Sequence, residues 1–175
     1  LLSLAVHIRV PEDYCSQEWK DANAVTHAIE TLQALDTILD EINNNRKSQS
    51  ESRVCIEVYT EDRFSSQQES LLIQHTEHLF RGGKEETKIH VYRQTPLLPC
   101  VQAMATADIF IPASSFLSCF AAFFQTSLVV LPNEPTRRNS YFLPHLQHDN
   151  ICPIVPVENK AMLQKTVEAV LESLL

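Results

Sequence analysis

Two segments decide the fold of this chain: LLSLAVHIR, from Leu1 to Arg9, and ADIFIPASSF, from Ala107 to Phe116. Each contains an apolar run and ends in polar residues. Continuous apolar runs are typical of strands that are buried on both faces of a parallel sheet. Ligands of open α/β sheets bind at the carboxyl ends of the strands. Both segments therefore predict buried strands that deliver polar groups to a ligand-binding edge.

The composition permits one domain with a substantial core. The chain has 175 residues, of which 44% are hydrophobic, and we interpret residues 1–175 as a single domain. No run approaches the roughly 18 apolar residues that a membrane span needs. The chain starts in a strand-like segment without Met or a charged leader, so we expect a piece of a longer protein rather than a signal peptide.

Charge and glycine content restrict the ligands that are plausible. The formal net charge is −8, which argues against nucleic acid or an anionic membrane as the main partner. The chain has only 2 glycines, where average usage is about 7%. Both the GxGxxG fingerprint and the P-loop are absent. A bound nucleotide would therefore be held by side chains and a helix terminus.

Several catalytic and metal signatures are missing. The 5 cysteines form no CxxC pair, and neither HExxH nor GxSxG occurs, so we expect neither a zinc site nor a hydrolase elbow. Cys55 and Cys119 lie in apolar segments, which favours buried reduced thiols. The sequence leaves open whether one disulfide forms and which cellular compartment holds the protein.

Hydrophobic periodicity predicts alternating strands and helices. The expected strands are Leu2–Val10, Val54–Thr60, Ile89–Tyr92, Ile109–Ile111, Leu128–Leu131 and Ile151–Val157. The expected helices are Asp21–Ile42, Ser66–Leu79, Leu97–Thr106, Ser115–Gln125 and Glu158–Leu175. A capping box at Ser66 and Glu69 opens the second helix, and Gly82-Gly83 follows it as a stop.

The alternation predicts an α/β fold with a doubly wound, mostly parallel sheet and helices on both faces. The expected strand order is 3-2-1-4-5. In that order the first and fourth strands are neighbours at the switch point, where a ligand crevice forms. The two segments quoted above supply these strands.

The first strand ends in two candidate ligand groups. His7 and Arg9 are two residues apart, so they point to the same face of the strand. The planar, permanently charged guanidinium of Arg9 suits a diphosphate; alternatively it pairs with Glu12 or Asp13 and clamps the loop. His7 either packs as a satisfied core histidine or offers its edge to a base.

The serines after the fourth strand predict the start of a helix and a candidate anion site at that start. One of Ser114 and Ser115 is the expected N-cap. The other hydroxyl and the first-turn N–H groups are then available to an anion; the alternative is an ordinary serine cap. The helix that begins at Phe116 is apolar on nearly all sides, so we expect it to be buried.

Acidic residues follow the second strand at the same sheet edge. Glu61 and Asp62 come directly after the strand that ends at Thr60. Their carboxylates could accept hydrogen bonds from a ribose or a base amino group. The alternative is a solvated acidic turn.

Three motifs together resemble a known family. They are HIR at His7–Arg9, YTED at Tyr59–Asp62 and MATADIFIPASSF at Met104–Phe116. Their order and spacing are similar to those of fucosyltransferase-type glycosyltransferases of the GT-B fold, over most of the chain from Leu4 to about Pro132. The resemblance implies that this domain is the Rossmann-like, donor-binding C-terminal lobe of such an enzyme.

The resemblance also implies roles for the matching residues. His7, Glu61 and Asp62 would contact the guanine base of a donor such as GDP-fucose. Arg9 would bind the β-phosphate and stabilise the leaving diphosphate. The phosphates would be cradled by Ser114, Ser115 and the backbone at Phe116. Fixed positive groups would replace a metal ion, and transfer would be inverting.

The chain departs from the family pattern directly after Arg9. Val10 stands where the family has a second arginine, and Pro11-Glu12 stands where it has Gly-Asp. The cations that could replace the missing arginine are Arg93, Arg137 and Arg138. Glu12 is the one candidate general base in this lobe.

These departures keep two other functions open. One is a catalytically silent module that binds a sugar nucleotide or a glycan, and the other is a structural α/β interaction domain. For a transferase, the resemblance implies a glycan or glycoprotein acceptor. In a eukaryote it also implies the Golgi lumen, behind the membrane anchor of the full-length protein.

Overall fold

The computed structural model describes residues 1–9, 17–46, 54–60, 64–80, 87–113, 115–132 and 152–174. Its strands are β1 (Leu2–Ile8), β2 (Val54–Thr60), β3 (Lys88–Arg93), β4 (Ile109–Ile111), β5 (Leu128–Leu131) and β6 (Ile154–Pro156). Within these ranges the helices are α1 (Gln17–Arg46), α2 (Ser66–Thr76), α3 (Leu97–Thr106), α4 (Phe116–Phe124) and α6 (Lys160–Ser173).

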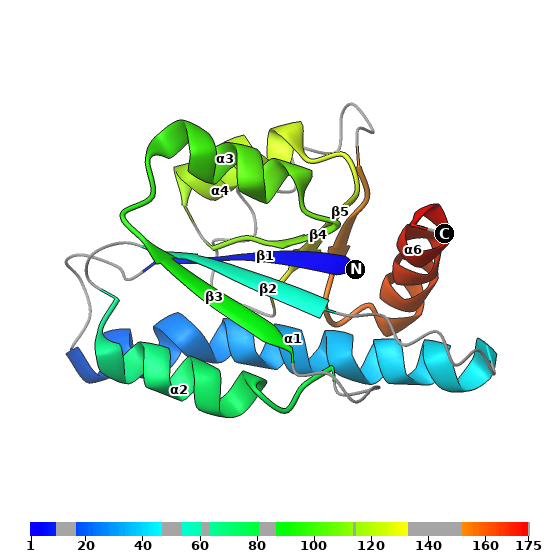
Figure 1. Ribbon diagram of the computed structural model, residues 1–175, viewed down its shortest axis with the longest axis horizontal. Helices are drawn as coiled ribbons and strands as arrows, with labels where there is room; N and C mark the ends of the chain where they lie inside the picture. The colour runs from blue at the N-terminus through cyan, green and yellow to red at the C-terminus, as the bar shows by residue number, and fades with distance from the viewer. Residues whose placement is uncertain are drawn as a thin grey trace.

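All six strands form one parallel sheet in the order β3-β2-β1-β4-β5-β6. The predicted order is therefore confirmed, with β6 added beyond β5. In Figure 1, α1 and α2 lie below the sheet and α3 and α4 lie above it. The chain thus has the doubly wound, Rossmann-like α/β fold that the sequence predicts. Strands β1 and β4 are neighbours, so their carboxyl ends meet at the switch point.

The larger core lies on the α1 side of the sheet. Because side chains alternate along a strand, every second residue of β1 faces this side. Those residues are Leu2, Leu4, Val6 and Ile8. Helix α1 packs a stripe from Val25 to Ile42 against them, and α6 adds Leu163 and Val167 to the same core.

The smaller core lies between the sheet and the pair α3 and α4. From β1 it receives Ala5, which is opposite Phe110 of β4 in the strand register. A small residue beside a large one lets this layer pack without voids. The α3 helix contributes Met104 and α4 contributes Ala121. His7 belongs to this face by alternation, and so it lies under α3 and α4.

Polar groups fix the amino end of β4 to β1. The Ser3 N–H and hydroxyl both donate to Asp108 Oδ2 over 2.7 Å, and the Asp108 N–H donates back to Ser3 Oγ over 3.1 Å. Asp108 precedes β4 at the edge opposite to the predicted ligand edge. This residue of the family-like motif therefore serves the fold.

Several predicted boundaries need correction. Strand β1 ends at Ile8 rather than Val10, so Arg9 lies just beyond the strand. Helix α1 runs from Gln17 to Arg46, beyond the predicted range on both sides. Its core stripe ends at Ile42, and the polar residues after it continue the helix into solvent, which an apolar pattern does not register.

Two helix starts also differ from the prediction. The capping box of α2 is one residue earlier: Ser65 is the N-cap, and Gln68 bonds back to it. Helix α6 begins at Lys160 after the N-cap Asn159, rather than at Glu158. Since Ser65 and Ser66 both have an amide or carboxylate three residues later, the pattern alone fits either register.

The prediction that α4 is buried on nearly all sides is wrong. One face packs in the smaller core, but Phe120, Phe123 and Phe124 are 42%, 54% and 50% exposed. Their rings stack edge to face on one another. The helix lies in the outer layer, so among the described residues only its sheet-facing side is covered.

Cysteines Cys55, Cys100, Cys119 and Cys152 are free thiols. Cys100 is buried, whereas Cys55 and Cys119 are only half-buried. The prediction that Cys55 and Cys119 are buried is therefore wrong, because each is partly exposed. Burial raises the pKa of the Cys152 thiol to about 11.

Gln125 joins the ends of α3 and α4 through four hydrogen bonds. Its fully buried side chain donates from Nε2 to the carbonyls of Met104 and Ala107, over 3.1 and 2.9 Å. Its Oε1 accepts the N–H groups of Thr126 and Ser127 over 2.7 and 2.9 Å. The side chain therefore satisfies every hydrogen bond that an amide of this kind can readily make.

Replacing Gln125 by leucine should lower the free energy of unfolding by about 2–4 kcal/mol, because four backbone groups lose their partner. Gln102→Leu is the matched control, since Gln102 is exposed on α3. Urea unfolding of both variants measures the difference. Equal midpoints would show that Gln125 is not a structural clamp.

Candidate functional site

His7 connects the end of β1 to the first turn of α4. Its Nδ1 lies 2.6 Å from Ser118 Oγ and 3.4 Å from Ser115 Oγ. Ser115 is the N-cap of α4, and its hydroxyl accepts the Ser118 N–H over 3.1 Å. The Ala113 N–H donates to Ser118 Oγ over 2.9 Å. Two of the sequence motifs are therefore joined at the switch point.

The environment of His7 favours a neutral ring. The side chain is only 4% exposed. Burial, assisted by the positive charge of Arg9, lowers the pKa of His7 to about 4. At neutral pH the imidazole is therefore uncharged, with one nitrogen as donor and the other as acceptor.

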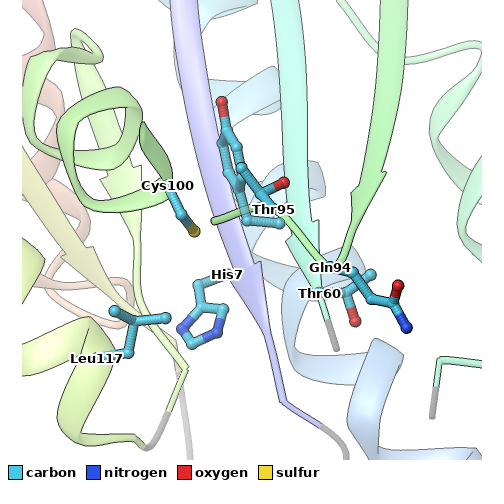
Figure 2. A pocket seen from close by; sticks show the side chains of 7 residues that line it. His7, Thr60, Gln94, Thr95, Cys100 and Leu117 are labelled. Atoms are coloured by element: carbon cyan, nitrogen blue, oxygen red, sulfur yellow. The ribbon is translucent and has the colours of Figure 1, made fainter. Parts of the chain in front are cut away.

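A pocket of about 260 Å³ opens beside His7 at the carboxyl ends of β1 and β2. Figure 2 shows His7 between Leu117 and Cys100 on the helical side and Thr60 and Gln94 on the strand side. The lining residues are His7, Tyr59, Thr60, Gln94, Thr95, Cys100 and Leu117. At neutral pH this described lining carries no formal charge, so it suits an uncharged, hydrogen-bonding group.

A tight turn closes the pocket on the β3 side. Gln94 directly follows β3 and has a φ of 55°, in the left-handed region that residues other than glycine seldom adopt. Its N–H donates to the Thr60 carbonyl over 3.3 Å. The turn redirects the chain from the sheet towards α3 and places Gln94 and Thr95 at the pocket.

Tyr59 forms the wall of the pocket on β2. It is opposite His7 in the strand register, and its ring stacks on Tyr92 of β3 with centroids 5.2 Å apart. Its hydroxyl donates to Glu57 over 2.8 Å. Burial and this hydrogen bond raise the pKa of Tyr59, so the ring stays neutral and acts as an apolar surface.

Arg9 lies one residue beyond the end of β1 and is exposed. Its charge lowers the pKa of His7, so the guanidinium is near enough to act on the ring electrostatically. Ser115 contacts the same ring from α4. Arg9 and Ser115 are thus both neighbours of His7, although neither lines the pocket.

The start of α4 matches the predicted cap. Ser115 caps the N–H of Ser118, and its carbonyl accepts the N–H of Cys119. The remaining orphan donors of a first helical turn are, by helix geometry, the N–H groups of Phe116 and Leu117. These two groups and the dipole of the helix favour an anion at this end.

Some predicted site residues lie outside the described residues. They are Glu12, Glu61, Asp62 and Ser114, together with the possible replacement cations Arg137 and Arg138. Cys15 and Gly82-Gly83 also fall outside. The roles predicted for these residues therefore stay predictions.

Arg93, the third possible replacement cation, is engaged elsewhere. It forms an ion pair with Glu69 of α2 and lies 5.9 Å from the centroid of the Phe64 ring. In the strand register it pairs with Thr60, one residue after the row of Tyr59 and His7. Strand alternation therefore turns it to the α2 face, away from His7.

The sequence prediction missed the main partner of His7. Ser118 is the lone hydroxyl within the apolar helix Phe116–Phe124, and such an isolated polar residue was the available signal. The pocket residues Gln94, Thr95 and Cys100 gave no comparable signal, because their proximity arises from the turn after β3.

Comparisons with known proteins give no family assignment: no protein-family model matches the chain, and no curated protein matches it significantly.

Within the described ranges, no three His, Cys, Asp or Glu side chains form a group that could hold a metal ion. None of the described helices combines the length and apolarity required to cross a membrane.

The depressed pKa of His7 should make stability fall with acidity. The unfolded chain binds the proton near pH 6.5, whereas the folded chain resists it until about pH 4. Stability that is present above pH 6.5 is therefore lost as the pH falls towards 4, by about 2 kcal/mol between pH 7 and pH 5. Urea unfolding at the two pH values measures this loss.

The matched control is His7→Gln, which lacks the titrating ring. Its stability should fall by about 2 kcal/mol less than that of the wild type over the same pH interval. An identical loss in both proteins would contradict the neutral, buried state of His7.

Proposed function

We propose that this domain is the donor-binding lobe of a glycosyltransferase. The enzyme transfers a sugar from a GDP-sugar to a glycan or glycoprotein acceptor, and the specific sugar proposed is fucose. The observation that carries the proposal is the hydrogen bonding of His7 to Ser115 and Ser118. It joins the HIR motif to the start of α4 at the switch point, where doubly wound sheets hold nucleotides.

The groups around His7 suit different parts of such a donor. Arg9, an exposed residue, and the first-turn N–H groups of α4 suit the diphosphate. The uncharged pocket beside His7 suits a nucleobase. Glu61 and Asp62 are proposed to complete base recognition, and Ser114 to add a hydroxyl to the phosphate cradle.

In the proposed reaction Arg9 stabilises the negative charge that develops on the leaving diphosphate. A fixed guanidinium and the N–H groups at Phe116 and Leu117 can provide this stabilisation without a metal ion. Glu12 is the candidate general base in this lobe. A second lobe would supply much of the acceptor site.

A non-catalytic module is the second candidate. Val10 replaces the second arginine of the family pattern, and Arg93 is ion-paired with Glu69 on the other face of the sheet. With one cation fewer, a bound diphosphate would be a poorer leaving group. The full-length protein with GDP-fucose and a panel of glycan acceptors distinguishes the two: turnover supports the transferase, and binding without transfer or hydrolysis supports the module.

Arg9→Ala should weaken the binding of GDP at least tenfold, because a charge-assisted hydrogen bond is worth about 1.5–3 kcal/mol. Calorimetry with GDP, GDP-fucose, GDP-mannose and UDP, without added metal, measures the effect. We expect guanine nucleotides to bind and UDP to bind poorly.

Arg93→Ala is the matched control, since it removes the same charge from the α2 face of the sheet. It should leave GDP affinity unchanged. Equal affinity of the wild type and Arg9→Ala would refute the phosphate role. No binding of any of these nucleotides to the full-length protein would favour the structural interaction domain.

A further inference from the structure

Ser118 is a buried hydroxyl in a helix that otherwise carries no hydrogen-bonding side chain except a thiol. Helix α4 has the sequence FLSCFAAFF, and Ser118 is 0% exposed. A serine at this depth contributes little apolar burial, and its hydroxyl must be satisfied by the protein. A side chain of this kind in the middle of a packing face calls for a specific partner.

In the described part of the chain, the Ser118 hydroxyl has two partners: the backbone N–H of Ala113 and a ring nitrogen of His7. The Ala113 N–H donates to Oγ over 2.9 Å, which leaves the hydroxyl proton to be placed. Among the described residues, the other group within reach is Nδ1 of His7, at 2.6 Å. Of the groups that the structure describes, Nδ1 is therefore the one that can accept the Ser118 proton, and one of the two neutral tautomers of His7 allows it.

Ser115 belongs to the same hydrogen-bonded group. Its hydroxyl oxygen already accepts the Ser118 N–H over 3.1 Å, and it lies 3.4 Å from Nδ1 of His7. If Nδ1 carried the ring proton, the buried Ser118 hydroxyl would be left without an acceptor among the described residues. With Nδ1 as acceptor, the Ser118 hydroxyl, the Ser118 N–H and the Ala113 N–H each have a partner.

We propose that Ser118 is a positioning residue whose hydroxyl holds His7 in the tautomer that carries its proton on Nε2. His7 then offers a bound ligand an uncharged N–H donor at a fixed orientation. That its ligand is a guanine nucleotide rests on the proposed function, whereas the tautomer does not.

The division of roles follows from charge. Arg9 is a permanent cation next to His7, and a second positive charge on the buried ring would be repelled by it. A neutral donor can recognise a carbonyl oxygen or a ring nitrogen without this penalty. Ser118 thereby selects a ligand with a hydrogen-bond acceptor at this point and disfavours one that presents a donor.

The tautomer can be read from the ring nitrogens directly. The chain labelled with ¹⁵N-histidine is examined at pH 7 without nucleotide, and the His7 signals are assigned by their loss in His7→Gln. We expect the wild type to show one tautomer, with the proton on Nε2. A proton on Nδ1, or a doubly protonated ring, would overturn the proposal.

Ser118→Ala removes the hydroxyl with almost no change in volume. We expect it to convert His7 into a mixture of tautomers and to weaken GDP binding by about threefold to tenfold, since one oriented hydrogen bond is lost. Cys119→Ala, the matched control, trims one atom from the next residue of the same helix. It should change neither the tautomer nor the affinity.

The two readouts separate the proposals. An unchanged tautomer in Ser118→Ala overturns the role of Ser118, whatever the protein binds. A changed tautomer with unchanged GDP affinity overturns the idea that His7 presents Nε2 to the ligand. If the tautomer behaves as expected but even the wild type binds no guanine nucleotide, the proposed function fails and the positioning role stands.

Discussion

The alternation of side chains along β1 is the constraint on which the rest of this structure depends. One set of residues packs against α1, and the other set, Ser3, Ala5 and His7, faces α3 and α4. Only Ala5 of that second set is apolar. The two polar members lie near the two ends of the strand. Ser3 bonds to Asp108, directly before β4, and His7 bonds to Ser118 in α4, the helix that follows β4. Hydrogen bonds therefore hold β1 in place near both of its ends, and the candidate site lies at its carboxyl end.

The sequence was sufficient to predict the elements and their order, because apolar runs and helical periodicity are local patterns. It could not define where polar segments continue a helix, as at Arg46, or which of two adjacent serines caps α2. It also led to an overestimate of the burial of α4, because composition shows which faces of a helix are apolar but not which elements pack against them. Phe123 is half exposed simply because nothing among the described residues covers that side.

The candidate site was predictable in part for the same reason. Strand ends and a serine cap are local signals, so His7 and Ser115 could be proposed as neighbours from the sheet order alone. Their contact at 3.4 Å is consistent with that expectation. Ser118 and Gln94 become neighbours of His7 only through the pitch of α4 and the left-handed turn after β3. Such features belong to tertiary packing, which sequence periodicity does not encode.

A hydrogen-bonded histidine at a strand end is not by itself evidence of ligand binding, because buried polar groups must be satisfied in any fold. The distinction lies in what the bonding accomplishes. Asp108 and Gln125 satisfy main-chain groups and bring no titratable ring to a cavity. His7 differs, since one ring nitrogen is satisfied internally while the residue lines a pocket and lies beside an exposed arginine. A purely structural clamp would need neither the pocket nor the neighbouring cation, and this asymmetry is the physical reason to look for a ligand here rather than at the other end of β4.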